Sequence, residues 1–172
     1  MLTTPRLVLR RFRPSDSPAL IAYRSDPEVA RFQSWDVVDA AASLAAGDPD
    51  EAGWFQYAVE RTADRTLIGD VGVNTHDNLM QAEIGFTLSR AAQGQGYATE
   101  AVTAVLDHLF KVRGLHKVSA ECDARNAASE RLLTRLGFAL EGNRRQHTWI
   151  KGEWTDDLLF GLLTPEWIKR PE

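Results

Sequence analysis

Hydrophobic and polar residues alternate over residues 83–88, and the pattern then becomes helical. Apolar side chains occupy the even positions of this segment, whereas Glu83 and small or polar residues occupy the odd ones. This period of two predicts a strand with two different faces. The sequence Gln-Gly-Gln-Gly at 93–96 interrupts it, and apolar positions then recur with helical spacing over 98–110. The segment therefore predicts a strand, a glycine turn and an amphipathic helix, in that order.

The same patterns predict strands and helices along the whole chain. Strands are expected at 4–10, 55–59, 66–73, 83–88 and 117–122, followed by two or three strands between 138 and 163. Helices are expected after a cap at Ser15 or Asp16, within 28–47, over 96–113, over 127–136 and from Pro165. Turn residues at Asp64-Arg65 and at Gly152 separate neighbouring strands. This order predicts a mixed sheet with helices on both faces.

Composition narrows the classes of protein to consider. A chain of 172 residues, 44% hydrophobic and 26% charged, suits one globular domain. It has no apolar run of the ~18 residues that span a bilayer and no signal-peptide core, so the expected location is the cytoplasm. The net charge of −4 argues against general nucleic-acid binding. A single cysteine, Cys122, excludes an internal disulfide, and the histidines show no ligand spacing, so no metal is expected.

The glycine turn before the helix has the chemistry of an anion site. The first N–H groups of a helix lack intrahelical acceptors, and the helix dipole adds partial positive charge there. Such sites often hold phosphate. The chain has no Gly-Lys pair, which excludes a P-loop, and Thr99 replaces the third glycine of a dinucleotide fingerprint. These comparisons narrow the expected ligand to a compound that contains a pyrophosphate.

Several segments resemble the GNAT N-acetyltransferase superfamily. Residues 93–101 (QGQGYATEA) resemble its pyrophosphate-binding turn, although Ala91 stands where Gln or Arg is usual. Residues 126–133 (NAASERLL), with 136–138 (LGF), resemble the segment that contacts the pantetheine arm. The opening TPRLVLR and the pair Ile68-Gly69 are similar to the ribosomal-protein N-terminal acetyltransferase branch, the RimJ/RimL-like group.

This resemblance implies a fold, a co-substrate and a set of binding residues. The fold is a single α/β (α+β) domain over 1–172, with a mixed, mostly antiparallel, splayed sheet of about seven strands. Acetyl-CoA is the implied donor and a primary amine, on a protein N-terminus or a small molecule, the implied acceptor. The implied CoA-binding residues are Phe86, Thr87, Leu88, Gln93, Gly94, Gln95, Gly96, Tyr97, Ala98, Thr99, Asn126 and Ser129.

Two residues are candidates for catalysis. Glu83 matches the strand that carries a catalytic glutamate in several superfamily members, and we expect it to act as general base if burial raises its pKa or through a water. The alternative is a solvated strand carboxylate. Ser129 is expected to hydrogen-bond or protonate the departing CoA thiolate. Helix capping by Asn126 and simple surface polarity at Ser129 are the structural alternatives.

The acceptor is less constrained by the sequence. Trp35 is the most plausible aromatic residue for the acceptor site, and Asp36, Asp39 and Glu51 are candidates for charge in it. Arg10, Arg11 and Arg13 are expected at a solvated edge or against a second subunit of a homodimer. A non-catalytic acyl-CoA sensor, an aminoglycoside N-acetyltransferase and an acyl donor other than acetyl-CoA all stay open.

Overall fold

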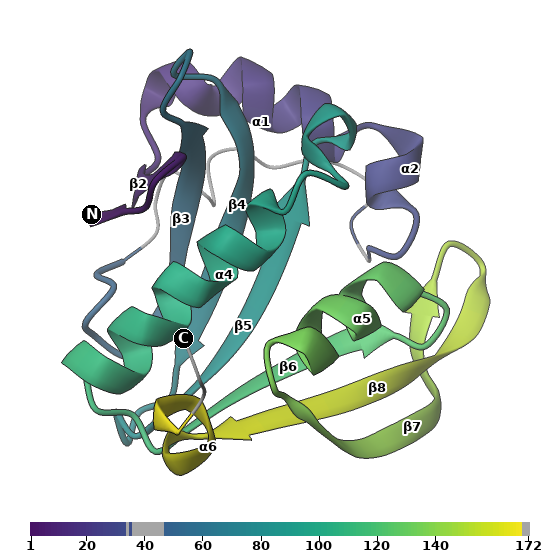
Figure 1. Ribbon diagram of the computed structural model, residues 1–172. Coiled ribbons are helices and arrows are strands. Elements are labelled where there is room, and N and C mark those ends of the chain that lie inside the picture. The colour runs from purple at the N-terminus through teal and green to yellow at the C-terminus, as the bar shows by residue number, and fades with distance from the viewer. Residues whose placement is uncertain (34, 36–46, 170–172) are drawn as a thin grey trace.

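One open sheet of eight strands organises the molecule (Figure 1). The computed structural model describes residues 1–33, 35 and 47–169. The strands are β1 (Leu2–Thr3), β2 (Leu7–Arg11), β3 (Gly53–Arg61), β4 (Leu67–Thr75), β5 (Gln81–Leu88), β6 (Lys117–Asp123), β7 (Ala139–Ile150) and β8 (Glu153–Leu163). Their order is β1-β2-β3-β4-β5-β6-β8-β7, and only β5 and β6 pair in parallel. The mixed, mostly antiparallel sheet of the prediction is confirmed, with one strand more than expected.

Helices cover both faces of this sheet. They are η1 (Pro14–Asp16), α1 (Ser17–Arg24), α2 (Pro27–Ala30), η2 (Arg90–Ala92), α4 (Tyr97–Asp107) with its π-helical continuation η3 (His108–Val112), α5 (Ala127–Arg135) and α6 (Thr164–Ile168). Helix α4 packs with the larger core cluster, which includes Leu9, Val59 and Val105. Helix α1 packs on the opposite face, where Leu20 and Tyr23 meet Ala58. Of the helical segments expected within 28–47, α2 is present, and residues 36–46 lie outside the described residues. No helix in the described ranges is long and apolar enough to cross a membrane.

The sheet splits between β5 and β6. These strands pair only from Gln81↔Lys117 to Ile84↔Ala120, and they then diverge (Figure 1). Beyond the split, β5 continues to Leu88 and β6 to Asp123. The unpaired strand ends leave backbone groups available to a ligand that lies between them. The splayed sheet that the sequence resemblance implied is therefore present.

Arg10 is buried, so the prediction of a solvated edge is wrong for this residue. Only 6% of it is exposed, and its guanidinium donates to Glu60 (2.8 Å) and to both oxygens of Asp16 (2.7 and 3.0 Å). Arg10 pairs with Ala58 and thus faces α1 instead of solvent. Asp16 stands at the N-cap of α1 as expected, but its carboxylate binds Arg10 and the Arg13 N–H and makes no side-chain cap hydrogen bond to the helix.

The C-terminal hairpin also differs in detail from the expectation. Residues 139–150 form the single strand β7, with register shifts after Leu140 and Arg144, where two separate strands were one of the options. The hairpin turn at Gly152 is confirmed, because Lys151 (φ 49°) and Gly152 (φ 90°) both adopt left-handed backbone conformations. Assembly as a homodimer stays a prediction.

Candidate active site

The glycine turn between η2 and α4 exposes a row of backbone donors. Gly94 (φ 74°) and Gly96 (φ 80°) adopt left-handed conformations that side chains disfavour. The N–H of Glu100 donates to the Gly96 carbonyl (3.1 Å). In the described chain, the N–H groups of Tyr97, Ala98 and Thr99 precede it and have no intrahelical acceptor. The turn therefore directs several donors and a helix dipole at one point, which suits a pyrophosphate.

The N-terminal segment holds this turn in place. Glu100 accepts from Thr4 Oγ1 (2.6 Å) and from Arg6 Nε (2.6 Å). The Arg6 guanidinium also donates to the Gln95 carbonyl (3.0 Å) and lies 4.5 Å from the centre of the Tyr97 ring. Burial opposes the ionisation of Glu100, but the hydrogen bonds from Thr4 and Arg6 lower its pKa below the usual value. The carboxylate is thus a fixed anchor for the first turn of α4.

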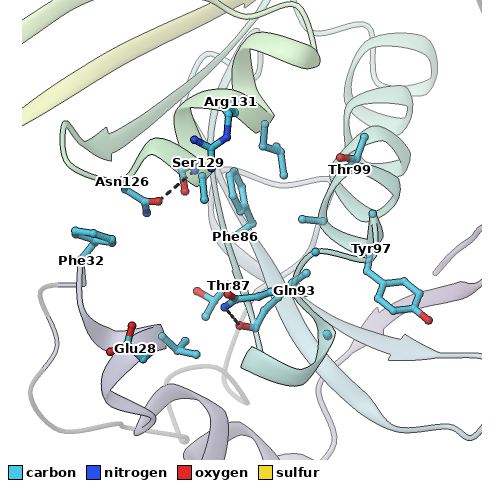
Figure 2. A pocket seen from close by; sticks show the side chains of 18 of the residues that line it. Glu28, Phe32, Phe86, Thr87, Gln93, Tyr97, Thr99, Asn126, Ser129 and Arg131 are labelled. Carbon is cyan, nitrogen blue, oxygen red and sulfur yellow. Dashed lines mark hydrogen bonds between the residues drawn. The ribbon is translucent and has the colours of Figure 1, made fainter.

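A first cavity of about 520 Å³ runs from this turn toward α5. Figure 2 shows Glu28 and Phe32 on one side of it, Asn126, Ser129 and Arg131 on the other, and Phe86 and Thr87 between them. The residues with which the sequence resemblance implied CoA binding line this cavity, with the single exception of Gln95. The Gln95 side chain instead donates to the Ala91 carbonyl (2.6 Å).

Two arginines of α5 that line this cavity were not predicted as site residues from the sequence. Arg131 and Arg135 line it from α5, four residues apart and therefore on one helix face. Their spacing was visible in the sequence, but nothing there showed that this face of α5 borders the glycine turn. The cavity thus combines backbone donors with guanidinium groups, and both suit the phosphates of coenzyme A.

A second cavity of about 270 Å³ adjoins the first. Both are lined by the same six residues at their junction, namely Phe32, Gln33, Phe86, Thr87, Asn126 and Ser129. The second cavity extends over the α1 face of the sheet, where the strand register places side chains in rows. One row is Gln56, Gly72 and Gly85 across β3, β4 and β5. Glu121 of β6 lies across the split from Gly85, because it follows the last paired position by one residue.

Glu121 lines the second cavity and was not singled out in the sequence. Its side chain is 33% exposed, and one carboxylate oxygen accepts from Arg144 (3.0 Å). Burial raises the pKa of Glu121 above its usual value, Arg144 opposes this, and the carboxylates of Asp157 and Glu83 add to it. A carboxylate with a raised pKa beside a cleft is a candidate general base.

Glu83 occupies the same face of the sheet as Glu121 but lines neither cavity. Its row is Trp54, Asn74, Glu83 and Ser119, one row before the split. It is half-buried. The prediction that it points away from the apolar side of β5 fits this register. The structure nevertheless brings Glu121, and not Glu83, to the cavity that contains Ser129.

The helix cap considered for Asn126 is present in the structure. Its Oδ1 accepts from the Ser129 N–H (3.2 Å) and caps α5, as Figure 2 shows. The capping oxygen leaves the amide NH₂ group as a donor on the cavity side. Asn126 and Ser129 line both cavities. The helix cap thus fixes the position of Ser129 at the junction.

The wall of the second cavity contains a buried polar cluster around Asp70. Asp70 is 2% exposed and accepts from Tyr23, from Arg24 (2.9 Å) and from Gln56 (2.9 Å). Burial and the neighbouring Asp70 raise the pKa of Tyr23 well above its usual value, so this phenol stays protonated. Cys122 is half-buried in the same wall. Burial raises its pKa to about 11, so it is a thiol near neutral pH.

Aromatic residues complete this cavity. Trp35, the aromatic candidate from the sequence, lines it together with Trp54. Trp149 and Trp154 pack on each other, with their ring centres 5.3 Å apart, and line neither cavity. Of the acidic residues proposed for the acceptor site, Glu51 is exposed and lines neither cavity, whereas Asp36 and Asp39 lie outside the described residues.

Comparisons with known proteins agree with this geometry. Residues 6–139 match the family described as "Acetyltransferase (GNAT) domain". The chain is 33% identical to an uncharacterized N-acetyltransferase, p20, of Bacillus licheniformis, over 96% of this chain and 97% of that protein. It is 31% identical to the [ribosomal protein uS5]-alanine N-acetyltransferase of Escherichia coli (strain K12), over 96% and 92% of the two chains. A spermidine N-acetyltransferase from Vibrio cholerae, solved in complex with CoA and spermine, shares the fold at a TM-score of 0.81 and 19% identity, over 96% and 100%. The chain belongs to the GNAT family and is an acetyl-CoA-dependent N-acetyltransferase.

Proposed function

We propose that this enzyme acetylates the α-amino group of a protein or peptide N-terminus by direct attack in a ternary complex. The two adjoining cavities carry this proposal. The first offers phosphate donors at the glycine turn and leads to Ser129, and the second leads from Glu121 and the aromatic wall to the same serine. Similarity over nearly the whole chain to an enzyme named for a ribosomal-protein alanine supports the choice of a protein N-terminus.

The proposed binding mode of acetyl-CoA uses the whole first cavity. The N–H groups of the glycine turn, with Arg131 and Arg135, hold the phosphates. The pantetheine arm lies in the split, where its amides pair with backbone groups of Phe86, Thr87 and Leu88. This places the thioester at the junction beside Asn126 and Ser129, within reach of an amine in the second cavity.

The reaction then proceeds without a covalent enzyme intermediate. The amine nitrogen attacks the acetyl carbonyl carbon, a C–N bond forms and the C–S bond breaks. Glu121 accepts the proton that the amine loses, directly or through a water. The Ser129 hydroxyl hydrogen-bonds the departing thiolate and donates a proton to it, and the serine regains a proton from solvent. We assign Glu83 a supporting role, because its carboxylate adds to the raised pKa of Glu121, after burial and Asp157.

Two measurements on the purified enzyme test the proposed function. A thiol-release assay with acetyl-CoA and a peptide that begins with alanine should give turnover, and the N-acetylated version of that peptide should give none. Calorimetry should show that CoA binds in the absence of acceptor. CoA binding without turnover on any amine contradicts catalysis and supports a sensor. Absence of CoA binding contradicts the assignment of the first cavity.

A further inference from the structure

The floor of the second cavity is bare backbone. Gly72 and Gly85 are paired across β4 and β5, and both line the cavity. A Cβ built on Gly85 meets no atom within 4 Å, so the space above this residue is open. Gly85 does not adopt a left-handed backbone conformation, so its backbone does not require glycine. What glycine provides here is a flat surface beside Glu121.

Trp54 extends this flat surface. A Cβ on Gly72 would lie 3.3 Å from the Trp54 ring, which shows that the indole lies across the β4 backbone where a side chain is missing. Trp54 is nevertheless 59% exposed, so a large part of its indole is free to contact a ligand. Trp35 differs, since its indole N–H donates to the Arg24 carbonyl (3.2 Å) and the Arg24 guanidinium stacks on its ring. Trp35 is a fixed wall, whereas Trp54 is an open platform.

The charge of this cavity suits a single ammonium group. Among the described residues, Arg24, Asp70 and Glu121 are the charged ones in its lining. The two oxygens of Asp70 already accept from Tyr23, Arg24 and Gln56, and the residue is 2% exposed. Glu121 is therefore the carboxylate that can meet the acceptor amine. Because Arg24 and Asp70 neutralise each other, no second carboxylate among the described lining residues is left for another cation on the same acceptor.

We infer that the acceptor is a singly charged primary amine whose adjoining uncharged, planar group stacks on Trp54 above the bare Gly72–Gly85 pair. The planar group is supplied by a peptide bond or by an aromatic ring. This inference rests on the proposed function and deepens it, because it specifies the chemistry of the acceptor body. It makes Trp54 and Gly85 determinants of acceptor specificity that take no part in the chemical step.

A panel of four amines tests the inference on the wild-type enzyme. The probes are an alanine-initiated peptide amide without other charges, phenethylamine, hexylamine and spermidine, assayed by thiol release. At least one of the two planar probes should exceed hexylamine and spermidine in kcat/KM by about tenfold or more, and the order of the first two identifies the source of the planar group. Spermidine or hexylamine as the best substrate overturns the inference but leaves the acetyltransferase assignment intact. No turnover with any probe, with CoA bound normally, contradicts the proposed function as well.

Variants distinguish the loss of acceptor stacking on Trp54 from the general effects of removing a tryptophan. Trp54→Ala and Gly85→Val should raise KM for the preferred planar probe by about tenfold and leave the calorimetric Kd for CoA within about twofold. Trp149→Ala is the matched control, since Trp149 is 56% exposed and lines neither cavity. It should change neither value. Unchanged KM in both Trp54→Ala and Gly85→Val, with CoA binding showing that the variants are folded, overturns the inference.

Discussion

The two cavities that meet at Ser129 are built in different ways. The first cavity, which we propose as the donor cavity, depends on a contiguous turn, in which Gly94 and Gly96 aim backbone N–H groups and α4 supplies a dipole. The second cavity, which we propose as the acceptor cavity, depends on side chains from separate elements, including Arg24 of α1, Trp54 of β3 and Glu121 of β6. A backbone-built site can bind the same co-substrate with many different side chains around it. A side-chain-built site changes its specificity with single substitutions.

Glu121→Gln should give the largest difference between the effects on turnover and on CoA binding. Loss of a positioned general base lowers kcat by about 10²–10⁴-fold. The Kd for CoA should stay close to that of the wild type, because Glu121 does not line the donor cavity. Thiol release and calorimetry on the same preparation measure both values.

Glu83→Gln is the matched control, and pH provides a second readout. Glu83 lines neither cavity, so its amide variant should lose far less kcat. Because the pKa of Glu121 is raised, kcat/KM of the wild type should fall as pH drops through a value above that of an ordinary carboxyl group. Removal of the Glu83 charge should shift this fall of kcat/KM to lower pH. If Glu83→Gln is instead the more damaging change, Glu83 is the base.

Asp70→Ala should damage stability and the acceptor cavity together. It leaves Arg24 buried without its carboxylate, and loss of one partner of a buried ion pair costs about 3–5 kcal/mol of unfolding free energy. Denaturant titration measures this loss, and KM for the amine should rise while CoA affinity of the folded fraction is retained. Asp64→Ala is the control, since it removes an exposed partner of Arg61 and should lower the unfolding free energy far less. Equal costs for the two variants contradict the role assigned to the cluster.

Gly96→Ala should weaken the donor cavity and leave the acceptor cavity unchanged. A left-handed conformation costs a side-chain-bearing residue about 1–2 kcal/mol, so a shift of the turn away from this conformation should weaken CoA binding about 5- to 30-fold. Gly114→Ala introduces the same strain at φ 70° outside both cavities. It should lower stability without a change in CoA affinity. Similar CoA affinities for both variants would show that the turn does not bind the pyrophosphate.

The difference between the cavities also explains what the sequence could predict. The donor turn is local, so its glycines, the following helix and the cap at Asn126 could all be identified from contiguous residues. Glu121 could not, because the alternation of β6 does not show where the strand separates from β5. Arg10 was misjudged for a related reason: only the register with Ala58 shows that it faces α1. The acceptor cavity consists of such long-range juxtapositions, and single-sequence patterns do not contain them.

A bisubstrate conjugate tests the central claim most directly. CoA whose sulfur is joined through a thioether –CH₂–C(=O)– spacer to the α-nitrogen of an alanine-initiated peptide should occupy both cavities at once. We expect it to bind at least about 100-fold more tightly than CoA in calorimetry, and Trp54→Ala should remove most of that excess while Trp149→Ala retains it. A conjugate that binds no more tightly than CoA would contradict transfer of the acetyl group between the two cavities at Ser129.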